Sequence, residues 1–179
     1  MQSKAITPEE AIKIMRDAGC PDEVLAHVAA VRELAMRIAK KAQANGHKVD
    51  ANLVELGSIL HDIGRSKTHG IDHAVIGAEI GRNLCFTDAL VNVIERHVGA
   101  GIPKKDAVNI GLPPKDYTPL TLEEKIVAHA DNLIGGSGRD PVAKTVAKLR
   151  KKGLEDAARR MEALHRELSA ICGTDLDLI

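Results

Sequence analysis

Apolar residues recur along most of this chain at intervals of three and four, which is the period of an amphipathic α-helix. The clearest apolar stripe consists of Val24, Val28, Val31, Leu34 and Ile38. Helix-capping residues and Gly or Pro divide the remaining stripes into separate segments. We therefore expect about eight helices, beginning near Thr7, Asp22, Asp50, Asp72, Thr87, Thr121, Asp140 and Leu154.

Residues 99–120 interrupt this pattern with Gly and Pro and show little periodicity. We expect a long loop there, and loops of this length in compact domains are often functional lids. No segment alternates between apolar and polar residues as a half-buried strand would, and we find no internal repeat. The prediction is an all-α, single-domain helical bundle over residues 1–179.

Composition narrows the classes of function. The chain has 25 Lys plus Arg and 25 Asp plus Glu, so no net charge draws it broadly toward nucleic acid or an anionic membrane. Its aromatic residues are one Phe and one Tyr, which form no platform for stacking several bases. Because hydrophobic residues make up 44% of the chain, an aliphatic core is expected rather than disorder.

Cysteine usage and hydropathy suggest a compartment. Cys20, Cys85 and Cys172 are odd in number and far apart, which is typical of a reducing environment rather than a disulfide scaffold. The N-terminus has no apolar signal core, and no apolar run approaches the ~20 residues needed to cross a bilayer. We expect a cytoplasmic protein without a membrane partner.

The pair His61-Asp62 directly follows the apolar run 53–60. Burying an imidazole and a carboxylate there is costly unless they are hydrogen-bonded, paired or bound to a metal. Both side chains are good ligands for Zn, Fe or Mn. Side chains that project inward from facing helices are the usual way a bundle builds such a site. The full candidate set is His27, His61, Asp62, His73, His97 and Asp131.

Each candidate also has an interpretation without metal. His61 could be a helix-terminal histidine, with Asp62 capping the next turn. His27 and Asp131 could belong to a buried ion pair with a basic residue. His73 could face solvent at a helix start, and His97 could be favoured by the helix dipole at a C-terminus. The order and spacing of the whole set favour ligation over these separate explanations.

The order of these residues, and the stretch His61-Asp62-Ile63-Gly64-Arg65, resemble the HD-domain superfamily of metal-dependent phosphohydrolases in its HDIG form. The segments 72–81 and 94–97 look like those of RNA-degrading and cyclic-nucleotide-degrading members. The resemblance covers roughly residues 22–135, with flanking helices in 1–20 and 139–172. It implies an HD-type bundle that hydrolyses a phosphomonoester or phosphodiester of a nucleotide, a cyclic nucleotide or an RNA end.

The resemblance also implies roles for the residues. Its core ligands would be His27, His61, Asp62 and Asp131, and the additional ligands of the two-metal subset would be His73 and His97. One or two divalent ions (Mn, Fe, Zn, Co or Ni) are expected, and the nitrogen ligands disfavour Mg. Asp62 would bridge two ions, and His61, Asp62 and Arg65 would be the catalytic residues. Arg65 stands where HDIG members commonly carry Lys, and it can bind phosphate through two parallel hydrogen bonds.

Two other classes of function stay open. Some HD-fold proteins, such as myo-inositol oxygenase, use the same six-ligand set for a di-iron centre, which iron content and oxygen consumption would reveal. A non-catalytic nucleotide-binding module is the second alternative, although an intact ligand set argues against it. The HDIG form resembles hydrolases more closely than either.

Several other residues that could belong to a site are instead expected at the surface. These are His47, His69, His165, Lys67, Lys104 and Lys105, of which Lys67, Lys104 and Lys105 are candidates for phosphate contact. His129 should face away from Asp131, two positions along the same helix. The basic segment 144–166 lies opposite an apolar stripe, which favours a solvated face over nucleic-acid binding. The expected partner is a small phosphorylated substrate such as a nucleotide, with a homodimer contact as an alternative use of this segment.

Overall fold

The computed structural model describes residues 6–135 and 138–179, and most of this part is helical. Its helices are α1 (Pro8–Asp17), α2 (Asp22–Ala44), α3 (Ala51–Leu60), α4 (His73–Asn83), α5 (Asp88–Arg96), α6 (Lys104–Asn109), α7 (Leu122–Leu133), α8 (Val142–Lys151) and α9 (Glu155–Cys172). Two short 3₁₀ helices are η1 (Ile63–Ser66) and η2 (Leu176–Leu178). The predicted all-α bundle is confirmed.

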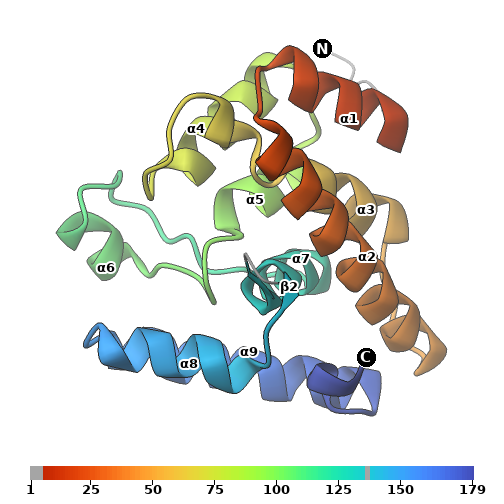
Figure 1. Ribbon diagram of the computed structural model, residues 1–179, viewed down its shortest axis with the longest axis vertical. Coiled ribbons are helices and arrows are strands. Elements are labelled where there is room, and N and C mark those ends of the chain that lie inside the picture. Colours follow the sequence, from red (N-terminus) through yellow and green to blue (C-terminus); the bar gives the residue numbers. More distant parts are fainter. Residues whose placement is uncertain (1–5, 136–137) are drawn as a thin grey trace.

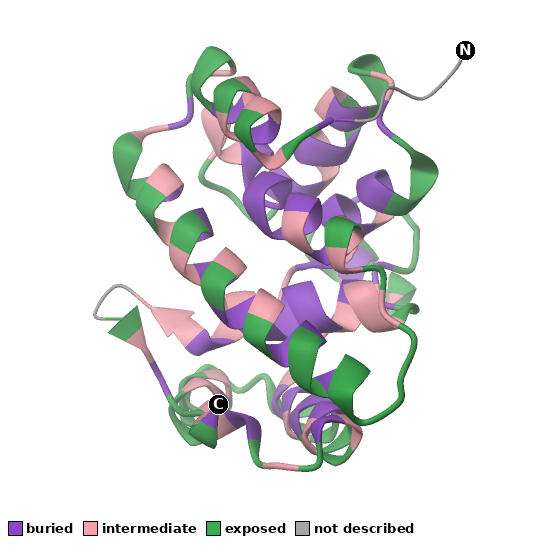
Figure 2. Ribbon diagram, turned by 90° about the vertical axis from the view of Figure 1, so that its right-hand side faces the viewer, coloured by how far each residue is buried: buried purple, intermediate pink, exposed green. Residues whose placement is uncertain are grey.

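Helix α7 lies in the middle of the bundle, between the upper helices and the α8–α9 pair that forms the lower layer (Figure 1). Its residues Ile126, Val127, Ala130 and Leu133 are fully buried in one hydrophobic cluster with residues of α2, α3 and α9. A second cluster joins α1, α2 and α3 to the segment around α5. The buried faces of the helices meet along the centre of the molecule, while their outer faces are exposed (Figure 2).

The predicted capping residues begin four of the helices. Thr7 and Glu10 form a reciprocal capping box at α1. Asp50, Thr87 and Thr121 accept a hydrogen bond from a backbone N–H of the first turn of α3, α5 and α7. These bonds satisfy donors that a helix N-terminus otherwise leaves unpaired, which is why the starts could be read from the sequence.

Two local expectations were wrong. Residues 99–120 contain the short helix α6, held by a small cluster of Ala107, Leu112 and Tyr117. Six residues are too few for a periodic apolar stripe. Strands β1 (Ile134–Gly135) and β2 (Gly138–Arg139) form an antiparallel hairpin, and two residues each are too few to show alternation. In the described ranges, no helix combines the length and apolarity needed to cross a membrane.

His165, which we expected at the surface, is buried on α9 against His129 of α7. His165 Nε2 lies 3.0 Å from Asp175 Oδ1, and a carboxylate can only accept, so this nitrogen carries the proton. His165 Nδ1 then accepts from His129 Nε2, 3.0 Å away. Packing of α9 against α7 buries His165, and the hydrogen bonds offset the loss of water.

This histidine pair should make the fold sensitive to acid. Burial, with His165 and Arg139 nearby, lowers the pKa of His129 from 6.5 to about 3. Since the unfolded chain binds this proton more tightly, the free energy of unfolding should fall by about 2 kcal/mol between pH 7 and pH 5. In His129→Gln, urea unfolding followed by circular dichroism should show less than half of that loss. An equal loss in both proteins would rule out His129 as the cause.

Candidate metal centre

Five helix segments bring the predicted residues together. His27 lies on α2, His61 caps the C-terminus of α3, and Asp62 follows it as the chain turns into η1. His73 is the first residue of α4 and His97 caps the C-terminus of α5. Asp131 lies in the last turn of α7. The helix ends, rather than the helix middles, supply most of the cluster.

Asp62 is the hub of the cluster, and its two oxygens face different histidines. Oδ1 lies 3.2 Å from His73 Nε2 and 3.6 Å from His97 Nε2. Oδ2 lies 3.7 Å from His61 Nε2 and 3.9 Å from His27 Nε2. A carboxylate placed between two pairs of nitrogens has the arrangement of a bridging ligand.

Asp131 closes one side of this arrangement. Its Oδ1 lies 2.8 Å from His27 Nε2 and 3.6 Å from His61 Nε2. Ligand atoms of His27, His61 and Asp131 lie within 4.8 Å of one another, as do those of His61, Asp62 and His97. His61 belongs to both groups, so the two groups are continuous.

Backbone carbonyls fix the orientation of three of the imidazole rings. Nδ1 of His61 lies 2.8 Å from the Ser58 carbonyl oxygen. Nδ1 of His73 and of His97 make the same kind of contact, at 2.8 Å with Gly70 and 2.7 Å with Ile94. Since a carbonyl can only accept, each Nδ1 carries a proton, and each ring turns its other nitrogen, Nε2, toward Asp62.

This donor set fits a divalent transition metal. His61 Nε2 is buried and has no hydrogen-bond partner within the described residues. The Nε2 atoms of His73 and His97 lie 3.0 Å apart, although in the neutral rings both present lone pairs. Buried polar atoms normally have partners, and a cation shared by nitrogen and carboxylate donors would satisfy all of these at once.

The carboxylates and imidazoles of the cluster shift one another's pKa values. Burial raises the pKa of Asp62, but His61, His73 and His97 outweigh it and leave this pKa far below the usual range. The pKa of Asp131 is likewise lowered, by His27 and His61 against its burial. Burial alone would lower the pKa of His61, but the two carboxylates raise it to about 9. The carboxylates are therefore ionised and attract positive charge into the centre.

Arg65 stands at the mouth of the centre. Its Nε donates to Asp62 Oδ1 at 3.2 Å and its Nη1 donates to the His69 carbonyl at 2.9 Å. Its side chain lines a polar cavity of about 200 Å³ that also reaches His73, His97 and Asp131. The other predicted phosphate contacts, Lys67, Lys104 and Lys105, are exposed and do not line this cavity.

Sequence reasoning missed the parts of the centre that have no side chain. The carbonyls of Ser58, Gly70 and Ile94 orient the rings, yet any residue type could supply them. Gly64 is a second omission: a Cβ there would lie 1.9 Å from the His73 carbonyl oxygen. The Gly of the HDIG stretch thus lets η1 approach the start of α4, and its place beside the ligands was the available signal.

The chain is similar over most of its length to two other proteins. A tRNA (cytidine(56)-2'-O)-methyltransferase of Thermoplasma volcanium is 48% identical over 176 residues, which are 97% of this chain and 51% of that protein. The chain thus spans about half the length of this relative. An uncharacterized protein of Methanocaldococcus jannaschii is 51% identical over 144 residues, covering 80% of this chain and 85% of the relative.

Solved structures share the fold. The HD domain of the L. monocytogenes phosphodiesterase PgpH superposes with a TM-score of 0.53 at 17% identity, covering 91% of this chain and 97% of that one. A second structure, of the same domain in complex with cyclic-di-AMP, gives a TM-score of 0.55. The family model of the HD domain matches residues 24–136, which include all six residues of the centre. The chain therefore belongs to the HD domain family.

Proposed function

We propose that this protein is a metal-dependent phosphohydrolase that cleaves a phosphomonoester or phosphodiester of a nucleotide, a cyclic nucleotide or an RNA end. The observation that carries the proposal is the placement of Asp62, with one oxygen facing His73 and His97 and the other facing His61 and His27. Family membership supports the reaction class, because the matched region contains the whole ligand set.

The residues divide naturally between two ions. His27, His61, Asp62 and Asp131 would hold one, and Asp62 with His73 and His97 would hold the other. Bound divalent ions would supply Lewis acidity and hydroxide at neutral pH. Hydrolysis joins a water oxygen to phosphorus and breaks the ester P–O bond, so the alcohol departs with a proton from that water. The nitrogen donors among these ligands favour Mn, Fe, Zn, Co or Ni over Mg.

The chain itself would position the phosphate. Arg65 is tied to Asp62 and to the His69 carbonyl, so its guanidinium is held at the cavity mouth before a substrate arrives. Its remaining N–H groups could donate to phosphate oxygens. This fixed placement lowers the entropy lost on binding.

Names of similar proteins support the substrate class. One similar structure contains cyclic-di-AMP, a cyclic nucleotide, and one relative is named for an action on tRNA. The methyltransferase name belongs to a protein of which this chain matches half, so we do not propose that activity here. Cyclic-di-AMP and tRNA are both built from nucleotides joined by phosphodiester bonds, which is a class of ester that we propose as substrate.

The direct test is a panel of phosphomonoesters and phosphodiesters assayed with Mn, Fe, Zn, Co, Ni and Mg after treatment with a chelator. We expect hydrolysis to return with transition metals, in step with the metal content of the protein. Absence of hydrolysis with every metal and ester would contradict the proposal. Oxygen consumption by the iron-loaded protein would instead support the di-iron alternative.

Arg65 offers a narrower prediction. Arg65→Met should lower kcat/KM by about 10–100-fold, because hydrogen bonds to a charged group contribute about 1.5–3 kcal/mol. Arg65→Lys keeps the charge and should recover part of the loss. Metal content is measured in both variants, because Arg65 also contacts Asp62. Wild-type kcat/KM in Arg65→Met, at equal metal content, would show that Arg65 does not bind the phosphate.

A further inference from the structure

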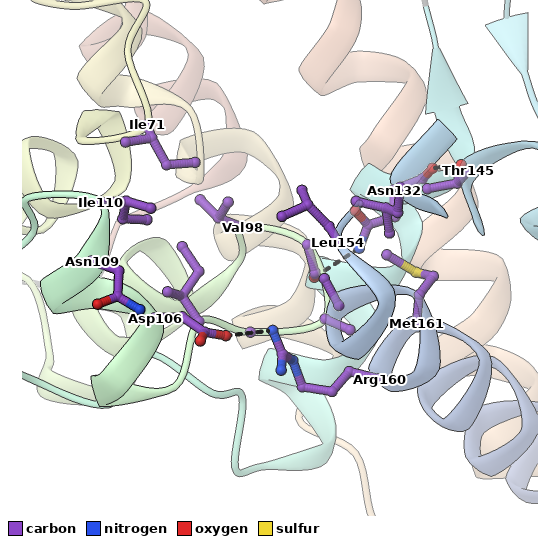
Figure 3. Close-up of a pocket in the computed structure, with 16 residues that line it drawn as sticks. Ile71, Val98, Asp106, Asn109, Ile110, Asn132, Thr145, Leu154, Arg160 and Met161 are labelled. Carbon is purple, nitrogen blue, oxygen red and sulfur yellow. Dashed lines mark hydrogen bonds and ion pairs between the residues drawn. The ribbon is translucent and has the colours of Figure 1, made fainter. Parts of the chain in front are cut away.

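A second and larger cavity lies between the segment after α5, helix α6 and the α8–α9 pair (Figure 3). Its volume of about 460 Å³ is within the range of about 300–1,000 Å³ typical of small-molecule sites. Most of its wall is apolar, from side chains such as Val98, Ile102, Ile110, Leu149, Leu154 and Met161. Neither the motif nor the metal centre accounts for it.

This apolar cavity adjoins the polar cavity of the metal centre. Ile71, Val98 and Gly99 line both cavities. His97, whose Nε2 faces Asp62, directly precedes Val98 in the chain. A molecule with one end among the histidines could therefore extend its other end into the apolar cavity.

Charge at the apolar cavity is balanced internally. The charged side chains that line it are Asp106 of α6 and Arg160 of α9, whose Oδ2 and Nη2 lie 3.1 Å apart (Figure 3). A ligand that brought a charge into this cavity would lose water without gaining an unpaired counter-charge. The cavity thus suits an uncharged group.

Two amide side chains give the apolar cavity a few hydrogen-bonding groups. Asn132 donates its Nδ2 to the carbonyls of Gly99 and Ala128, which leaves its Oδ1 without a hydrogen bond in the described chain. Asn109 also lines the cavity, from α6. An occupant could therefore be a ring with one or two hydrogen-bonding edges, but its surface must be mainly apolar.

We propose that this cavity holds the organic part of the substrate, an uncharged and mainly apolar group such as an aromatic ring, while the phosphate lies beside Arg65. This inference rests on the proposed hydrolase function. One wall comes from residues 145–161, which lie outside the matched region 24–136. The α8–α9 pair, and not the HD core alone, therefore selects the substrate.

The test compares two alkyl esters with similar leaving groups, benzyl phosphate and ethyl phosphate. Ala157 of α9 lines the cavity, so Ala157→Phe should fill it and lower kcat/KM for benzyl phosphate by about tenfold or more. Hydrolysis of ethyl phosphate should change by less than about twofold, because this ester does not reach the cavity. Ala163→Phe makes the same change on the exposed face of α9 and should alter neither rate.

Binding of 2-naphthol, followed by its fluorescence, provides a second readout that needs no catalysis. It should bind the wild-type protein and Ala163→Phe but not Ala157→Phe. If Ala157→Phe fails to fold, Leu154→Trp fills the cavity from a position that is 49% exposed. Equal effects on both esters, or unchanged naphthol binding in the filled variants, would overturn the proposal. Selective naphthol binding without hydrolysis of any ester supports the cavity site and refutes only the hydrolase.

Discussion

Replacing Asp62 by asparagine should remove bound metal and lower phosphoester hydrolysis by more than about 100-fold. Loss of a residue that merely supports a ligand typically costs about 10–100-fold in metal affinity or activity, and Asp62 contacts four of the histidines itself. The amide keeps the shape of the side chain but loses its charge and one acceptor. Metal analysis of the purified variant and kcat/KM on the best ester would measure both effects.

Asp17→Asn is the matched control, because it makes the same change on the exposed end of α1. It should keep wild-type metal content and activity. A circular dichroism melt of both variants separates loss of metal from loss of fold. Full hydrolysis by Asp62→Asn at low metal content would refute a catalytic metal at this position.

Gly64→Ala should destabilise the protein by about 3 kcal/mol or more and disturb the metal centre with it. The added Cβ would lie 1.9 Å from the His73 carbonyl oxygen and 2.8 Å from the Gly77 nitrogen. Both neighbours are backbone atoms of α4, so the whole start of that helix must move. His73 begins this helix, and its Nε2 would move away from Asp62. Urea unfolding and metal titration would detect the two effects.

Gly46→Ala provides the comparison for backbone effects. Its added methyl group would meet nothing within 4 Å, but the residue has a φ of +86° after the end of α2. We expect it to cost about 1–2 kcal/mol from the left-handed backbone alone, with metal affinity unchanged. A Gly64→Ala protein as stable as Gly46→Ala would mean that η1 and α4 separate easily.

Most of the helical bundle could be predicted, because the sequence signals that mark its helices are local. Stripes of apolar residues at helical spacing, and the caps Thr7, Asp50, Thr87 and Thr121, mark the helices without any knowledge of their packing. Helix α6 and the β1–β2 hairpin were missed because they are too short to repeat an apolar pattern along the sequence. His165 was misplaced because its burial depends on His129, which lies 36 residues earlier in the chain.

The candidate site could be predicted in its residue types but not in its geometry. The order of His27, His61, Asp62 and Asp131 pointed to ligation, and the structure brings these residues together with His73 and His97. No sequence pattern revealed the carbonyls that orient the rings, because every residue has one. The apolar cavity also left no motif, because residues from four separate segments line it.

The anchoring of the imidazole rings by backbone carbonyls has a consequence for the stability of the protein. The Nε2 atoms of His73 and His97 lie 3.0 Å apart and present lone pairs to each other in the neutral rings, and the Nδ1 contacts with backbone carbonyls prevent both rings from turning away to relieve the repulsion. This repulsion makes the folded state less stable, and the hydrophobic clusters must outweigh it. Replacing His97 by leucine would remove this repulsion, so we expect His97→Leu to be more stable than the wild-type protein but inactive. Metal binding and stability would then place opposite demands on this one position.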